Sequence, residues 1–169
     1  MKRLVMATAI WMASAAAAEE PARAPDAVRQ LEGCWQGRGE VMGKPVTIAV
    51  EARPVALGAM LALDASSVAI DDPSDRYAAH LVLGGGKGSA DVIGFWSDSF
   101  GGTMTAIGSG TLRANGFDIG YRYGEATFLN GWQVAGERLR WEIVAQEKGT
   151  SQAFASYVLT RAACVSGAE

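Results

Sequence analysis

The chain has 169 residues, of which 49% are hydrophobic and 20% charged, and its formal net charge is −3 at pH 7. A mildly acidic chain lacks the basic surface that nucleic-acid binding requires, so no nucleic acid is expected as a partner. The length is that of a single domain, because domains most often contain about 100–150 residues.

The chain begins with the features of an export signal. Lys2 and Arg3 form a basic start, residues 4–12 form an apolar core, and residues 16–18 (Ala-Ala-Ala) form a small-residue cleavage site. The apolar core is too short for a transmembrane helix, which needs about 20 apolar residues, so no membrane span is expected. No cysteine follows the cleavage site to carry a lipid anchor. We therefore predict a signal peptide over residues 1–18 and a soluble periplasmic or secreted protein.

A leader and a short helix are expected next. Residues 19–25 contain two prolines and no apolar pattern, which predicts a flexible leader. Asp26 is placed to cap a short helix that runs to Leu31 and would plug one end of a barrel. Residues 26–169 are thus predicted to form one β-barrel domain.

Ten short segments rich in β-forming residues follow this helix, separated by Gly, Pro, Asn and Asp. Apolar and polar side chains alternate within them, as at Val46, Ile48 and Val50, which is typical of antiparallel strands with one covered face. Short strands between turn signals favour a sandwich or a barrel. The predicted strands cover residues 33–42, 45–52, 57–70, 75–83, 90–98, 103–113, 116–123, 126–135, 138–147 and 151–162.

Two glycine-containing turns carry further predictions. Asn115-Gly116 predicts a two-residue hairpin turn of type I′, in which both residues have positive φ. Residues 84–89 (Gly-Gly-Gly-Lys-Gly-Ser) have a composition like that of a phosphate-binding loop. That loop needs Ser or Thr directly after the lysine and then a helix, whereas Gly88 and a predicted strand follow here. We expect a hairpin loop and no nucleotide cofactor.

The two cysteines, Cys34 and Cys164, both lie in the exported part, and an oxidising compartment favours their pairing. With two cysteines only one disulfide is possible. The bond would bring Arg161 close to Trp35, where the guanidinium can stack on the indole face. The alternative, a metal site, is poorly served by two cysteines and one histidine, and no metal is expected.

Three segments resemble the calycin superfamily. They are residues 31–37 (Leu-Glu-Gly-Cys-Trp-Gln-Gly), residues 93–99 (Ile-Gly-Phe-Trp-Ser-Asp-Ser) and residues 157–161 (Tyr-Val-Leu-Thr-Arg). The chain is most similar to bacterial lipocalin-like barrels grouped as a domain-of-unknown-function family. The resemblance implies an all-β fold: a single antiparallel up-and-down barrel of 8–10 strands around a cavity for a small apolar molecule.

The sequence also departs from relatives of this kind. The Thr-Asp-Tyr loop motif of true lipocalins is missing. A sister branch resembles the haem-binding nitrobindins, whose axial histidine comes late in the chain, whereas no histidine follows His80 here. The resemblance to nitrobindins therefore does not imply haem binding by this chain, and no cofactor is expected.

The leading functional prediction is an exported barrel that binds a small hydrophobic or amphipathic molecule in its interior. Aromatic side chains with a few polar tips are typical of such sites, although the same side chains would serve equally as ordinary core. The candidate ligand-binding residues are Trp96, Asp98, Tyr121, Tyr123, Trp132 and Trp141. Trp35 and Arg161 are assigned to barrel closure.

Two other functions stay open. Asp98 and His80 are candidate acid and base groups for an enzyme of the cell envelope, since a histidine can titrate near neutral pH. No motif completes a catalytic set around them, so no catalytic residue is assigned. The other alternative is a solid barrel with a structural or interaction role.

Overall fold

The computed structural model describes residues 22–164. The predicted signal peptide and residues 19–21 of the predicted leader lie outside the described residues. Within the described part of the chain, no helix has the length and apolar character needed to cross a membrane.

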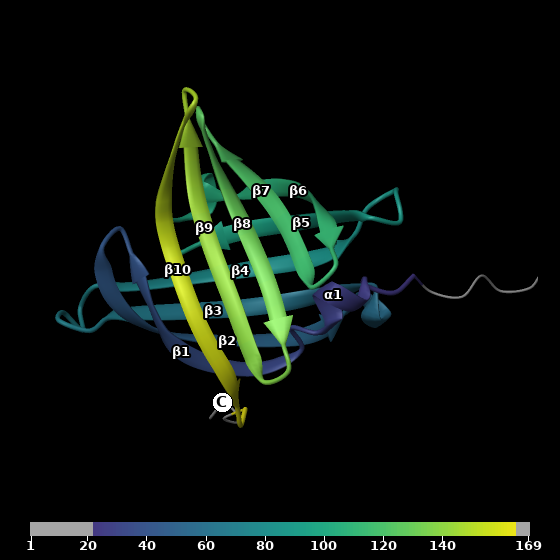
Figure 1. The fold of residues 1–169 in the computed structure, drawn as a ribbon, viewed down its shortest axis with the longest axis horizontal. Helices are drawn as coiled ribbons and strands as arrows, with labels where there is room; N and C mark the ends of the chain where they lie inside the picture. Colours follow the sequence, from purple (N-terminus) through teal and green to yellow (C-terminus); the bar gives the residue numbers. More distant parts are fainter. Residues whose placement is uncertain (1–21, 165–169) are drawn as a thin grey trace, which may run out of the picture.

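The described chain folds into a closed antiparallel barrel of ten strands, in which each strand pairs with its neighbours in sequence and β1 pairs with β10 (Figure 1). The predicted all-β barrel is therefore confirmed. Strands β7–β10 run steeply across the strands behind them in Figure 1. The elements are α1 (Asp26–Arg29), β1 (Gly33–Val41), β2 (Lys44–Val55), η1 (Ala56–Gly58), β3 (Met60–Ala69), β4 (Arg76–Gly85), β5 (Asp91–Asp98), η2 (Gly102–Met104), β6 (Ala106–Arg113), β7 (Gly116–Tyr123), β8 (Ala126–Ala135), β9 (Arg138–Glu147) and β10 (Thr150–Ala162).

Three local predictions were wrong. Residues 57–58 and 103–104, predicted as strand, belong to the short helices η1 and η2. The β6–β7 hairpin turn consists of residues 114–115, neither of which has positive φ, so it is not the predicted type I′ turn at 115–116. Gly116 instead starts β7, where a Cβ would lie 1.9 Å from the carbonyl oxygen of Trp132. The glycine there permits a close approach of β8.

One end of the barrel is closed by α1, and we call it the helix end. Val28 and Leu31 are fully buried beneath the strands, and the indole N–H of Trp35 donates to the Leu31 carbonyl at 2.7 Å. The predicted cap differs in detail. The residue before the helix is Pro25, and Asp26 lies within the first turn, where it forms an ion pair with Arg29.

The seam between β1 and β10 is reinforced at the same end. The predicted disulfide between Cys34 and Cys164 is present. The Arg161 guanidinium lies 4.2 Å from the centroid of the Trp35 ring. It also donates to the carbonyls of Glu32 and, at 3.1 Å, Gln30, just after α1. One side chain thus connects the last strand, the first strand and the helix.

Candidate functional site

The interior of the barrel consists of two halves that differ in exposure. Near the helix end, which we call the sealed half, most inward side chains are fully buried, with 0% exposure for Leu31, Trp35, Leu63, Leu83, Phe117 and Leu139. Leu112 and Val134, at the ends of β6 and β8, are partly buried. Toward the opposite end, the inward side chains keep 5–9% of their surface exposed, as for Ile48, Ser67, Ala79, Trp96, Ala106 and Ala145. This gradient indicates that solvent reaches the second half, which we call the open half. The loops at its end, residues 42–43, 70–75, 99–105, 124–125 and 148–149, form the mouth.

Aromatic rings cross the interior where the two halves meet. Trp141 on β9 stacks on Trp132 at 4.1 Å between ring centroids and lies 5.9 Å from Trp96 on β5. Since β5 and β9 are not neighbours in the barrel, this last contact spans the interior. The Trp141 indole N–H donates to the Asn130 side-chain oxygen at 2.9 Å, which fixes the orientation of its ring. These rings form the floor of the open half.

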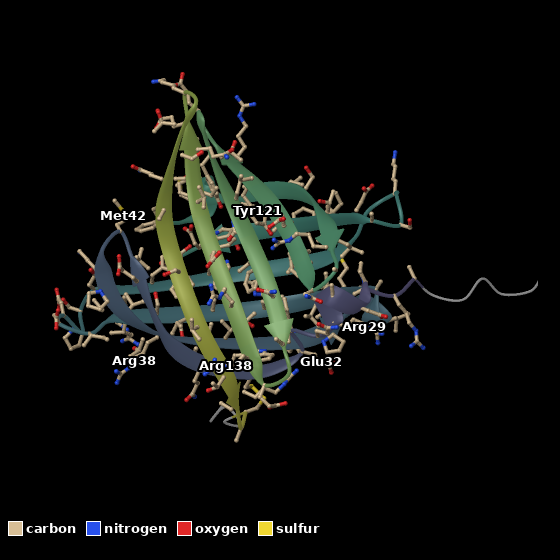
Figure 2. The ribbon with its side chains drawn as sticks, in the orientation of Figure 1. Arg29, Glu32, Arg38, Met42, Tyr121 and Arg138 are labelled. Atoms are coloured by element: carbon tan, nitrogen blue, oxygen red, sulfur yellow. A yellow bond between two sulfur atoms is a disulfide. The ribbon has the colours of Figure 1, made fainter. Side chains whose placement is uncertain are left out.

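Tyr121 fits beside this floor because two glycines leave space for it. Gly94 and Gly108 are directly paired on β5 and β6. A Cβ at Gly108 would lie 2.6 Å from the Tyr121 ring, and one at Gly94 would lie 2.5 Å from its hydroxyl oxygen. Figure 2 shows Tyr121 within the body of the barrel, whereas Met42, which is 70% exposed, lies at the mouth.

Partly buried aromatic side chains surround the mouth. Tyr123 and Phe128 pack edge-to-face at 5.8 Å, and Phe128 packs likewise against Phe154 at 5.0 Å. Phe154 lies at a β-bulge, where the register of β10 against β9 shifts between Ala153 and Ala155. The extra residue allows Phe154 and Ala155, although consecutive, both to pack against the core. Apolar ligand surface would therefore meet rings on β7, β8 and β10.

A carboxylate lies on the inner face at the mouth end of β5. The side chain of Asp98 accepts hydrogen bonds from the Tyr77 hydroxyl at 3.2 Å and the Trp96 indole N–H at 3.3 Å. It also accepts one from the backbone N–H of Phe100 at 2.9 Å. No Lys, Arg or His among residues 22–164 forms an ion pair with this carboxylate. Asp98 is thus held in place by neutral donors alone.

Burial and this negative charge act together on the tyrosines. Burial is the main cause that raises the pKa of Tyr77, Tyr121 and Tyr123, and the charge of Asp98 raises those of Tyr77 and Tyr123 further. Burial raises the pKa of Tyr157 to about 12. All four tyrosines of the chain therefore stay protonated over the physiological range, and Tyr77 donates its hydroxyl proton to Asp98.

The residues predicted to bind a ligand all lie on the inner face of the barrel. Trp96, Asp98 and Tyr123 border the open half, whereas Trp132 lies in the sealed half and Tyr121 beside the floor. Sequence reasoning missed the inward residues Tyr77, Asn130, Phe128, Phe154 and Tyr157. For Tyr77, Asn130 and Tyr157 a signal existed, because each shares a strand face with a buried apolar residue two positions away.

The two predicted acid and base groups do not share a site. Asp98 pairs in register with Ala79 and points inward, whereas His80 pairs with Ser97 and points outward. The partner of His80 is Asp64, whose Oδ1 lies 2.7 Å from Nδ1. The two candidate acid and base groups therefore lie on opposite faces of the sheet.

Asp64, His80 and Ser97 form a row on the outer face, and they border a shallow groove of about 560 Å³ over β1–β5. The order matches the residue types of an Asp-His-Ser hydrolase. However, no hydrogen bond joins His80 and Ser97 in the described part of the chain. The side chains of His80 and Asp64 are 47% and 53% exposed, so the row lacks the water-excluded setting on which such catalysis depends.

No protein-family model and no curated protein matches this chain.

The Tyr121 hydroxyl allows a test of hydrogen bonding at the floor of the open half. It is buried without a hydrogen-bond partner in the described part of the protein, beside Leu83 and Ile119. A buried unpaired hydroxyl is costly, so Tyr121→Phe is expected to raise the free energy of unfolding by about 1 kcal/mol. Tyr77→Phe is the matched control. Its hydroxyl donates to Asp98, so its loss should destabilise by about 1–2 kcal/mol in the same urea titrations. A loss of stability in Tyr121→Phe would show instead that this hydroxyl has a partner.

Proposed function

We propose that this chain is an exported, lipocalin-like barrel of the calycin type that binds a small hydrophobic or amphipathic molecule in the open half of its interior. The observation that carries the proposal is the difference between the two halves. In one, most inward side chains are fully buried, while in the other they keep 5–9% of their surface exposed and include aromatic rings and small side chains. A barrel with a purely structural role would not need one half that is densely packed and another that solvent reaches.

The chemistry of the open half fits such a ligand. Its walls would remove apolar ligand surface from water, which stabilises a complex by about 25 cal/mol per Å² buried. Tyr77, Tyr123 and Asp98 provide a few polar atoms among many apolar ones, as small-molecule sites usually do. The Tyr123 hydroxyl is buried and has no hydrogen-bond partner in residues 22–164, so a polar ligand atom that reached it would satisfy it.

Export is supported by two features. The disulfide between Cys34 and Cys164 is typical of proteins in non-reducing compartments. The sequence pattern of residues 1–18 predicts a cleavable signal peptide, which would direct the protein to the periplasm or to secretion.

A cavity-filling variant tests the proposal. Ala106→Leu places a larger side chain in the open half. The variant should keep the stability of the parent and lose at least about tenfold in affinity for an environment-sensitive, uncharged amphipathic probe, because the probe and the leucine compete for one space. Ala52→Leu is the matched control in the sealed half, where Ala52 is 3% exposed. Overpacking there should cost about 1–3 kcal/mol of stability.

Two results would contradict the proposal. If the parent protein binds no apolar or amphipathic probe, it does not have the proposed ligand-binding function. If Ala106→Leu loses as much stability as Ala52→Leu in urea titrations, the open half is packed like the sealed half and the barrel is solid.

A further inference from the structure

We infer that the ligand of the open half is an organic cation: an ammonium group, most favourably a quaternary one, joined to an apolar body. This inference rests on the proposed function and names the class of ligand. It follows from the placement of one uncompensated carboxylate inside an aromatic mouth.

Asp98 supplies the charge. Most charged side chains of strands β1–β10 face outward. Lys44, Glu147 and Arg161 share the inner strand face but lie at the barrel ends, where Lys44 is paired with Asp75, Glu147 with Lys148, and Arg161 covers Trp35. Asp98 is the partly buried carboxylate on the inner face at the mouth that has no such cationic partner among residues 22–164.

The Asp98 carboxylate has about four lone-pair positions for hydrogen bonds. The Tyr77 hydroxyl, the Trp96 indole and the Phe100 backbone N–H use three of these. Its charge and one acceptor position remain for a partner that is not part of the described chain.

The rings around the carboxylate suit the same partner. Tyr77 and Trp96 donate to it directly, and its charge contributes to the raised pKa of Tyr77 and Tyr123. Trp96 also lies 5.3 Å from Tyr121, ring to ring. The faces of indole and phenol rings attract cations, and aromatic cages are a recurrent means of holding quaternary ammonium groups. A carboxylate beside such rings attracts the same group.

Other ligand classes fit this site less well. A neutral apolar ligand would remove water from Asp98 without compensating its charge, and an anionic ligand would in addition be repelled. A divalent metal ion needs several oxygen or nitrogen ligands. Among residues 22–164, no group of three or more His, Cys, Asp or Glu side chains could hold one. An ammonium head near Asp98 with its apolar body over the floor satisfies both parts of the site.

Three probes with the same alkyl chain test the inference: decyltrimethylammonium, decanol and decyl sulfate. Each is titrated below its micellar concentration and followed by tryptophan fluorescence and calorimetry. The folded parent protein should bind the ammonium probe about tenfold or more tighter than decanol, and decyl sulfate most weakly. Asp98→Asn keeps the size of the side chain and removes the charge. It should abolish the preference for the ammonium probe while leaving the affinity for decanol within about twofold.

The controls separate the charge of Asp98 from general effects. Asp64→Asn removes a carboxylate on the outer face and should leave all three affinities unchanged. Should Asp98→Asn fail to fold, Tyr123→Leu provides the second variant: it removes a ring beside Asp98 and should weaken binding of the ammonium probe more than that of decanol.

The outcomes distinguish the two proposals. Equal binding of the three probes, or a preference for the ammonium probe that persists in Asp98→Asn, would overturn the cation inference while leaving the proposed function intact. Where Asp98→Asn does not fold, an undiminished preference in Tyr123→Leu would do the same. Absence of binding by all three probes would overturn both.

Discussion

Replacing Cys34 and Cys164 together by serine is expected to lower the free energy of unfolding by about 4–5 kcal/mol. The two cysteines are 130 positions apart in the sequence, so the bond closes a loop that contains nearly the whole domain. In the chain-entropy account the bond acts mainly on the unfolded chain, whose conformations it restricts more strongly the longer the loop. A loss of this size is a large part of the stability of a typical domain, about 5–15 kcal/mol.

The measurement is urea unfolding of the double variant beside that of the parent protein with and without reductant. The reduced parent should match the double variant, because both lack the covalent link and retain the seam between β1 and β10. The stacked pair of Trp35 and Arg161 should persist in the folded state of both. A loss below about 1 kcal/mol would show that the ends of the unfolded chain already lie close together without the bond.

Much of the fold could be predicted from the sequence because its signals are local. The bounds of β7, β8 and β9 agree with the predicted residues 116–123, 126–135 and 138–147. There the alternation of apolar and polar residues is regular and each strand ends at a turn residue. The segment 57–70 is apolar on both faces, so the sequence shows no clear start for its strand, and the structure begins β3 at Met60.

Gly116 caused the wrong prediction of a type I′ turn at residues 115–116. A glycine beside asparagine predicts a turn with positive φ, but Gly116 is needed for close contact with the backbone of β8. Such a contact joins residues distant in sequence, and no local pattern reveals it.

The candidate site was predictable only in part, for a related reason. Alternation correctly places Trp96 and Asp98 on one strand face, and the indole N–H of Trp96 donates a hydrogen bond to the Asp98 carboxylate. That Tyr77 from another strand donates to the same carboxylate depends on the register between β4 and β5. The same register places His80 on the opposite face of the sheet. Whether an inward side chain faces other side chains or open space depends on all ten strands together, so the sealed and open halves could not be distinguished.

Alkaline unfolding is expected to begin near pH 10 and to be accompanied by ionisation of the tyrosines, because a phenol has an ordinary pKa of about 10. The folded protein raises the pKa of all four tyrosines, mainly by burial, and that of Tyr157 to about 12. Since the folded-state pKa lies above the unfolded one, this contribution to stability is fully present below pH 10 and is lost as the pH rises toward about 12. For Tyr157 alone the loss is about 2–3 kcal/mol, given 1.36 kcal/mol per pKa unit.

A pH titration that records tyrosinate absorbance and near-ultraviolet circular dichroism checks this expectation. The absorbance should stay low while the protein is folded and rise together with the loss of the dichroism signal in one transition. The protein unfolded in urea should titrate as free phenol. If tyrosinate forms near pH 10 while the dichroism signal is unchanged, the phenols are in contact with water in the folded barrel. The mouth would then be wider than the packing of Tyr77 and Tyr123 around Asp98 allows.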